Sequence, residues 1–225
     1  MNDILKDLKR RIDHTDLKPD VDEKAVFNLC EEAHKFDFFA VCVNPVWVII
    51  AAERLKGSRT KVVSTSGFPL GANRTDIKAS ESAKAVKDGA SEIDMVANIG
   101  WIKSAGFKAV EKEIAEIRRS IPYNVVLKVI VEAPLLTKEE QIEATRAVVE
   151  GGAQFVKTGT GFFGNVTVEQ VKNLSNAANG KIQVKASGGI RTVEQCRQLL
   201  SSGATRLGSS SCVQIMQELE SAKCP

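Results

Sequence analysis

The sequence is poor in aromatic residues and has no strong charge bias. It holds one tyrosine and two tryptophans in 225 residues, and its net charge of +3 is spread along the chain with no basic block longer than residues 9–11. Proteins that bind nucleic acids usually join a basic patch to aromatic residues that stack on the bases. We therefore expect no nucleic-acid partner, although a weakly basic chain suits a small anionic ligand.

Long apolar runs are also missing. The longest covers residues 46–52, whereas a membrane-spanning helix needs about 20 apolar residues. No segment has the pattern of a signal peptide. We therefore expect no membrane partner and a cytoplasmic location.

Histidine and cysteine are too few and too scattered for the common metal and disulfide frameworks. The two histidines, His14 and His34, are far apart in the sequence, and no two cysteines form a C-x-x-C pair. A zinc site needs clustered His and Cys ligands, and an odd number of cysteines argues against a disulfide framework. We expect a reduced protein without a zinc site, while carboxylate-bound magnesium stays open. The cysteines are residues 30, 42, 196, 212 and 224.

Short apolar, β-branched runs alternate with segments of helical periodicity along the whole chain. This pattern predicts an α/β fold, a single (β/α)8 TIM barrel over residues 1–225 with a short N-terminal helix. A doubly wound open sheet is the alternative, but it usually has fewer strands. The expected strands are residues 11–15, 39–44, 61–67, 91–98, 124–133, 154–159, 181–187 and 205–211, and the clearest helical segments are 76–90, 107–121, 139–153 and 192–204.

The segment FVKTGTGFFGN, residues 155–165, has the G-x-G-x-x-G spacing of a dinucleotide-binding turn in Gly159, Gly161 and Gly164. Such a turn normally opens the first βαβ unit, with an acidic residue about 20 positions later. Here it follows the sixth expected strand, and the next strand has lysines but no Asp or Glu. The dinucleotide interpretation is therefore rejected.

Ionisable residues lie within several of the expected strands. Lysine is depleted in strands and is rarely buried without a partner, so three lysines in three consecutive apolar strands are hard to explain as surface residues. Each could point outward or pair with a carboxylate, but active sites of barrels lie where the strands end. The candidates are Asp13, Asp94, Lys128, Glu132, Lys157 and Lys185.

The pair Lys157 and Lys185 suggests amine chemistry. A lysine is nucleophilic only when neutral, and burial or a second cation nearby favours the neutral form. Neighbouring strands lie about 4.8 Å apart, so one lysine can form a Schiff base while the other moves protons. Asp94 supplies a carboxylate for acid–base work, although a purely structural salt bridge to the same lysines explains it equally well.

Two glycine- and serine-rich segments follow the last two expected strands, SGGIRT at 187–192 and GSSS at 208–211. Barrels often bind phosphate in the loops after strands 7 and 8, where backbone amides and a helix N-terminus meet the anion. The alternative is a tight turn and a helix cap. Phosphate binding is the better interpretation because both loops have the same character.

These motifs together resemble the deoxyribose-phosphate aldolase family of class I aldolases. The similarity covers nearly the whole chain: IDHTDLKPD, GFPLGANRTDIKASE, EIDMVANIG, LKVIVEAPLLT, FVKTGTGF, VKASGGIRT and RLGSSS. The resemblance implies reversible cleavage of 2-deoxy-D-ribose 5-phosphate to acetaldehyde and D-glyceraldehyde 3-phosphate, without a metal or organic cofactor. The implied partner is this phosphorylated sugar, and a homodimer and a homotetramer are both compatible with the sequence.

By the same resemblance, Lys157 forms the imine, Lys185 moves protons beside it, and Asp94 is the acid–base group. Asp13 lies beneath the pocket, and Cys42 matches a position that is often cysteine. The residues implied to bind substrate or its phosphate are Gly188, Gly189, Ser210, Ser211, Thr158 and Lys128.

The chain departs from the family at a few positions. Gly159 stands where serine is usual. In the segment KVVSTSGFPLG, many relatives have a pair of apolar β-branched residues before the first glycine. Two alternatives remain on the residues alone. One is another phosphate-binding barrel enzyme, such as a different Schiff-base lyase or a sugar-phosphate isomerase. The other is a catalytically impaired sugar-phosphate-binding barrel, for which Gly159 would be the warning.

Overall fold

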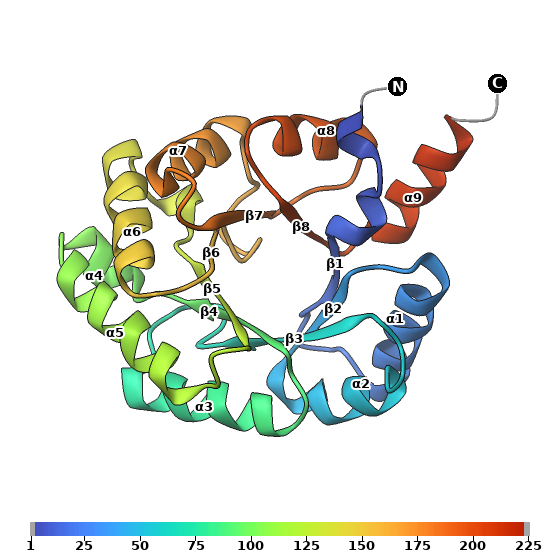
Figure 1. Ribbon diagram of the computed structural model, residues 1–225, viewed down its shortest axis with the longest axis horizontal. Helices are drawn as coiled ribbons and strands as arrows, with labels where there is room; N and C mark the ends of the chain where they lie inside the picture. Colours follow the sequence, from blue (N-terminus) through green and yellow to red (C-terminus); the bar gives the residue numbers. More distant parts are fainter. Residues whose placement is uncertain (1–2, 223–225) are drawn as a thin grey trace.

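The computed structural model describes residues 3–222, and its strands close into one barrel (Figure 1). All neighbouring strands are parallel, and β1 pairs with β8 through Ile12 and Leu207 to complete the ring. The predicted (β/α)8 barrel is therefore confirmed. The strands are β1 Ile12–Asp16, β2 Ala40–Val43, β3 Lys61–Ser66, β4 Glu92–Val96, β5 Val126–Ile130, β6 Phe155–Lys157, β7 Gln183–Ser187 and β8 Arg206–Ser209.

Helices surround the barrel on all sides (Figure 1). They are α1 Glu23–Phe36, α2 Val48–Arg54, α3 Thr75–Lys87, α4 Ile99–Lys103, α5 Phe107–Ser120, α6 Lys138–Glu150, α7 Val168–Ala178, α8 Val193–Ser201 and α9 Cys212–Ser221. The expected N-terminal helix is instead two short 3-10 turns, Asp3–Leu5 and Leu8–Arg11. Within residues 3–222 no helix combines the length and the apolar character that a membrane crossing requires.

Local sequence signals set the beginning of the helices in the second half of the barrel. In α7 and α8, Thr167 and Thr192 each accept a hydrogen bond from the backbone of a glutamine three residues later, and that glutamine side chain accepts one back from the threonine backbone. This reciprocal capping box satisfies two amides that a helix leaves unpaired. Helix α6 begins in the same way at Thr137.

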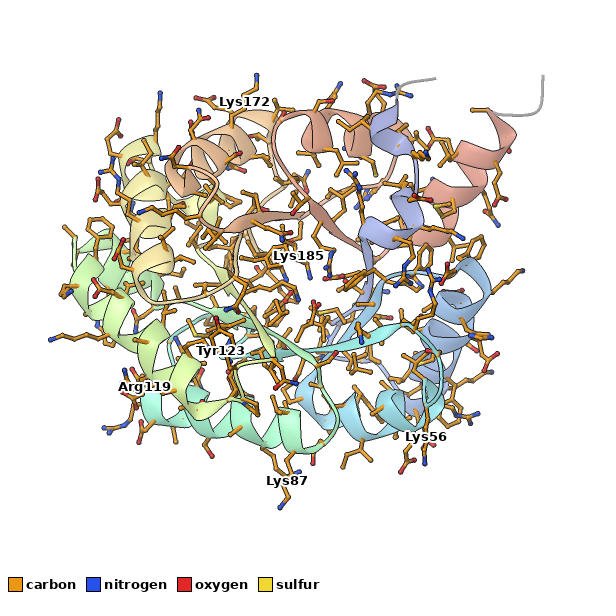
Figure 2. The ribbon with its side chains drawn as sticks, in the orientation of Figure 1. Lys56, Lys87, Arg119, Tyr123, Lys172 and Lys185 are labelled. Carbon is orange, nitrogen blue, oxygen red and sulfur yellow. The ribbon has the colours of Figure 1, made fainter. Side chains whose placement is uncertain are left out.

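The two faces of the barrel wall differ in chemistry. Residues that point outward, such as Val41, Ile93 and Leu127, pack into the main apolar core beneath the helices. Residues at alternate positions point inward, and many of these are charged. Figure 2 shows Lys185 near the centre of the ring, whereas Lys87 and Lys172 extend outward into solvent. The interior of the barrel is therefore where the unusual side chains gather.

Candidate active site

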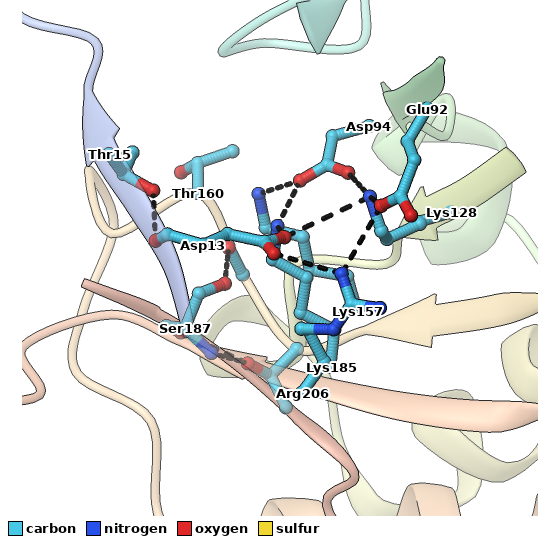
Figure 3. Close-up of polar contacts among 12 residues, drawn as sticks. Asp13, Thr15, Glu92, Asp94, Lys128, Lys157, Thr160, Lys185, Ser187 and Arg206 are labelled. Carbon is cyan, nitrogen blue, oxygen red and sulfur yellow. Dashed lines mark hydrogen bonds and ion pairs between the residues drawn. The ribbon is translucent and has the colours of Figure 1, made fainter. Parts of the chain in front are cut away.

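Seven ionisable side chains form a buried ionic cluster inside the barrel (Figure 3). All of their residues are less than 9 % exposed. Four are cations and three are carboxylates, and they come from six different strands. The members are Asp13 of β1, Glu92 and Asp94 of β4, Lys128 of β5, Lys157 of β6, Lys185 of β7 and Arg206 of β8.

Asp94 is the centre of the cluster and binds three lysines. Lys128 Nζ donates to Asp94 Oδ1 at 2.8 Å. Lys157 Nζ and Lys185 Nζ both donate to Asp94 Oδ2 at 2.7 Å. Because the two amines share one oxygen, their nitrogens lie no further apart than the sum of those two distances. Lys157 and Lys185 are also direct neighbours in the sheet register. The two lysines therefore lie side by side, as expected from the sequence.

Asp13 and Glu92 complete the cluster on its lower side. Asp13 binds Lys185 through Oδ2 and accepts a hydrogen bond of 2.9 Å from Arg206 through Oδ1. Glu92 Oε2 lies 2.5 Å from Lys128 Nζ and 3.3 Å from Arg206 Nη1. The Arg206 guanidinium also lies over the Phe39 ring, 3.5 Å from its centroid. These contacts hold the lysines in place from beneath.

The pKa values of the cluster follow from burial opposed by charge. Burial alone would raise the pKa of Asp94, but Lys128, Lys157 and Lys185 outweigh burial and hold it well below the usual value. For Asp13 burial is likewise outweighed, by Lys185 first, and its pKa falls to about 2. Burial would lower the pKa of Lys185, but Asp13 and Asp94 raise it instead. Both carboxylates are ionised and Lys185 is a cation near neutral pH.

A pocket of about 270 Å³ opens above the cluster. Of the four cations only Lys157 lines it, together with residues of the loops that follow β1, β6, β7 and β8. The remaining lining residues include Thr15, Asp16, Lys18, Thr160, Asn165, Ser187, Gly188, Gly189, Arg191, Ser209 and Ser210. The volume is close to the lower end, roughly 300 Å³, of small-molecule sites. The site therefore places one amine at the base of a polar pocket at the carboxyl ends of the strands.

The expected phosphate-binding residues divide into two groups. Gly188, Gly189 and Ser210 line the pocket. Gly189 has a φ of +70°, and a Cβ there would lie 2.1 Å from Asn165 Oδ1, so the loop requires glycine. Ser211 is not among the lining residues, and its amide donates to Ser209 Oγ.

Thr158 and Lys128 also lie behind the pocket wall. The Thr158 hydroxyl donates to Ser187 O at 3.0 Å and accepts from the Ser187 amide at 2.9 Å, so it links the ends of β6 and β7. Lys128 is fully buried beneath Asp94. In the structure these two side chains therefore contact protein groups and support the site from outside the pocket.

Several site residues were missed from the sequence although their signals were present. Arg206 and Glu92 are charged residues within apolar strands, which is the criterion that singled out the lysines. The prediction of phosphate binding by the SGGIRT segment named its two glycines, although Arg191 is part of the same segment. Lys18 and Arg191 add two positive charges to the lining of the pocket.

Glu132 explains how Gly159 fits. This buried carboxylate follows β5 in a left-handed conformation, φ 55°, and accepts hydrogen bonds from the Thr160 amide at 3.0 and 3.2 Å. Burial raises the pKa of Glu132. A Cβ at position 159 would lie 2.7 Å from Glu132 Oε1. The glycine therefore makes room for the carboxylate that holds the loop after Lys157.

The cysteines that the structure describes are free thiols, and all are buried: Cys30, Cys42, Cys196 and Cys212. Cys224 lies outside the described residues. Burial raises the pKa of the Cys42 thiol to about 11, so it is protonated near neutral pH. Among residues 3–222, no three His, Cys, Asp or Glu side chains are placed to hold a metal ion.

The comparisons with known proteins identify the family of this chain. A DeoC/LacD family aldolase model matches residues 10–214. Deoxyribose-phosphate aldolase of Natranaerobius thermophilus is 46% identical over 207 residues, 92% of this chain and 94% of that protein. The same enzyme of Streptococcus sanguinis is 45% identical over 216 residues, 96% of this chain and 98% of that protein.

Solved structures show the same relationship. An aldolase named QR15 superposes with a TM-score of 0.92 at 40% identity, covering 96% of this chain and 97% of its own. The tetrameric deoxyribose phosphate aldolase of Aeropyrum pernix gives a TM-score of 0.89 at 32% identity over 98% of both chains. The resemblance found in the sequence is therefore confirmed, and this chain belongs to the DeoC/LacD aldolase family.

Proposed function

We propose that this protein is a class I aldolase that reversibly cleaves 2-deoxy-D-ribose 5-phosphate to acetaldehyde and D-glyceraldehyde 3-phosphate. The observation that carries the proposal is the Lys157 amine, which is 3 % exposed, lines the pocket and lies 2.7 Å from Asp94 beside Lys185. Close relatives over nearly the whole chain are deoxyribose-phosphate aldolases. An amine, a carboxylate and a second cation in contact are the groups that imine chemistry requires.

The reaction begins when the neutral amine of Lys157 attacks the C1 aldehyde of the open-chain sugar. The carbinolamine loses water and gives a protonated imine. Asp94, directly or through a water, takes the proton of the C3 hydroxyl, C3 becomes a carbonyl, and the electrons of the C2–C3 bond pass into the imine. The resulting enamine is protonated at C2, and hydrolysis then releases acetaldehyde and frees Lys157.

Lys185 keeps a positive charge next to the reacting nitrogen, where its hydrogen bond to Asp94 Oδ2 also orients the carboxylate. A nearby cation disfavours a second charged amine, and Lys185 can pass protons to and from the carbinolamine. Asp13 and Arg206 hold Lys185 and the carboxylates beneath it.

In this proposal the phosphate of the sugar binds at the loops after β7 and β8. Gly188, Gly189 and Arg191 of the first loop and Ser210 of the second line the pocket. Backbone amides before a helix and an arginine fork are common phosphate ligands. In this proposal Ser211 supports the loop after β8 through its bond to Ser209.

The four buried free thiols fit a reducing compartment and support the cytoplasm as the location of this protein. The tetrameric relative from Aeropyrum pernix makes a homotetramer the assembly state to test before a homodimer.

Borohydride trapping tests the function. The protein is incubated with deoxyribose 5-phosphate, reduced, digested and analysed by mass spectrometry, with Lys157→Arg as the test variant and Lys172→Arg, at an exposed position, as the control. We expect the adduct on Lys157, and we expect Lys157→Arg to lose activity by several orders of magnitude because arginine stays protonated. Near-normal turnover in Lys157→Arg, or an adduct on another lysine, would overturn the assignment.

A further inference from the structure

The hydroxyl of Thr65 on β3 is buried and has no hydrogen-bond partner among the residues that the structure describes. Such groups are rare, because leaving a buried hydroxyl unpaired costs about 1–3 kcal/mol. The only other side-chain atom of this kind within residues 3–222 is His14 Nδ1. Thr65 therefore requires an explanation.

The alternation along β3 shows which way Thr65 points. Val63, two residues earlier, packs with Cys42 in the small apolar cluster inside the barrel. Ser66, one residue later, points to the helix layer, where its hydroxyl donates to Lys78 O and accepts from Ser82 of α3. Because strand side chains alternate, the Thr65 hydroxyl faces the barrel interior.

Thr65 is also the register neighbour of Asp94. The two residues pair directly between β3 and β4, and paired strands lie about 4.8 Å apart. Lys128 is the register neighbour of Asp94 on the other side, on β5. Asp94 is thus flanked by a lysine that it binds and by a hydroxyl that no group within residues 3–222 binds.

We propose that the Thr65 hydroxyl binds the oxygen that exchanges a proton with Asp94 during cleavage. This inference rests on the proposed function. That oxygen is the C3 hydroxyl of the sugar or the water that carries its proton to Asp94. Thr65 can donate to it or accept from it, which satisfies the buried hydroxyl and fixes the oxygen beside the carboxylate. Thr65 is then a positioning residue for carbon–carbon bond cleavage and has no part in forming the imine.

Two reactions of the same active site separate these steps. Cleavage of deoxyribose 5-phosphate needs the C3 hydroxyl. Exchange of the methyl hydrogens of acetaldehyde with deuterated water needs the imine and enamine on Lys157 and a base that removes the methyl proton, but it needs no C3 hydroxyl. Both are measured for wild type, for Thr65→Val, which keeps the shape but removes the hydroxyl, and for Thr65→Ser, which restores it. Ser66→Ala is the matched control on the other face of β3.

We expect Thr65→Val to lower kcat/KM for cleavage about three- to tenfold, the size of one neutral hydrogen bond, with exchange unchanged within a factor of two. Thr65→Ser should recover most of the loss. A rise in KM would identify the sugar hydroxyl as the bound oxygen, and a fall in kcat at constant KM would identify the water. The Tm of ligand-free Thr65→Val should equal or exceed that of wild type, whereas Ser66→Ala should lower Tm and leave the ratio of the two reactions constant.

Unchanged cleavage in Thr65→Val, or an equal loss in both reactions, would overturn the inference while leaving the aldolase function intact. A crystal structure of the ligand-free protein at a resolution that shows waters decides the matter independently of activity. An ordered oxygen within hydrogen-bond distance of Thr65 Oγ1 on its Asp94 side supports the inference. An empty site there contradicts it, even if wild type fails to cleave the sugar.

Discussion

Replacement of Lys128 by methionine tests whether the ionic cluster holds the barrel interior together. The Lys128 side chain is fully buried, and its Nζ lies 2.5 Å from Glu92 Oε2 and 2.8 Å from Asp94 Oδ1. Methionine keeps an unbranched side chain, one atom shorter than that of lysine, but cannot donate a hydrogen bond. The variant therefore takes the nearest cation from Glu92, which keeps only Arg206 at 3.3 Å, and removes one of the three lysines that bind Asp94.

The expected loss of stability is large. Removing one partner of a buried ion pair costs about 3–5 kcal/mol because the remaining charge stays buried. For a chain of this length each kcal/mol corresponds to roughly 2–4 °C in Tm, so Lys128→Met should unfold about 6–20 °C below wild type at pH 7. Adding Glu92→Gln should recover part of the loss, since it removes the carboxylate that has lost its nearest cation.

The pH dependence gives a second measurement. Burial would raise the pKa of Asp94, and Lys128 is the largest of the influences that lower it. A lowered carboxylate pKa contributes stability that is present above the unfolded value, near 4, and is lost as the pH falls through the folded value. The difference in Tm between wild type and Lys128→Met should thus be largest above pH 4 and become smaller below it.

Thermal unfolding of both proteins between pH 3 and pH 8 is the assay, and Lys108→Met is the control. Lys108 is 73% exposed in its contact with Glu111, and an exposed pair of this kind contributes about 0–1 kcal/mol. If Lys128→Met and Lys108→Met unfold at the same temperature at pH 7, the cluster does not stabilise the barrel and the reasoning is wrong.

Two further predictions concern the loop after β6 and the loss of stability at low pH. Gly159→Ala places a methyl group 2.7 Å from Glu132 Oε1, so we expect it to raise KM and to destabilise the fold by about 1–3 kcal/mol; steady-state kinetics and Tm check this, and wild-type values of both would contradict it. Asp13, with a pKa of about 2 set by burial opposed by Lys185 and Arg206, contributes stability that is full above about pH 4 and disappears toward pH 2. Acid titration followed by circular dichroism should show this loss. An Asp13→Asn variant with the same pH dependence of unfolding below pH 4 as wild type would refute it.

The alternation of strands and helices was predictable because each signal is local. Apolar runs and capping threonines such as Thr192 lie next to the elements they define. The ends of the strands were less accurate. The run at 124–133 continues beyond Ile130, where β5 ends and Glu132 takes a left-handed conformation. Hydrophobicity alone does not reveal where sheet pairing stops, because residues of the following loop are buried as well.

The lysines of the site were also predictable, because charged residues in apolar strands are unusual. The sharing of one Asp94 oxygen by Lys157 and Lys185 was not. It depends on the tilt and register of the closed barrel, which bring β4, β6 and β7 to the same point. Thr158 shows the opposite case. The family resemblance implied a substrate or phosphate contact for Thr158, and in the structure its hydroxyl bonds to the Ser187 backbone.

The contacts of the cluster also support the proposal that Lys157 is the amine that reacts. The cluster holds three carboxyl groups and four basic side chains. Arg206 cannot lose its proton. Lys128 and Lys185 each bind two carboxylates closely, and these raise the pKa of both lysines against the effect of burial. Among residues 3–222 Lys157 binds Asp94 alone, and it lines the pocket, so it is the cluster amine that a substrate can reach.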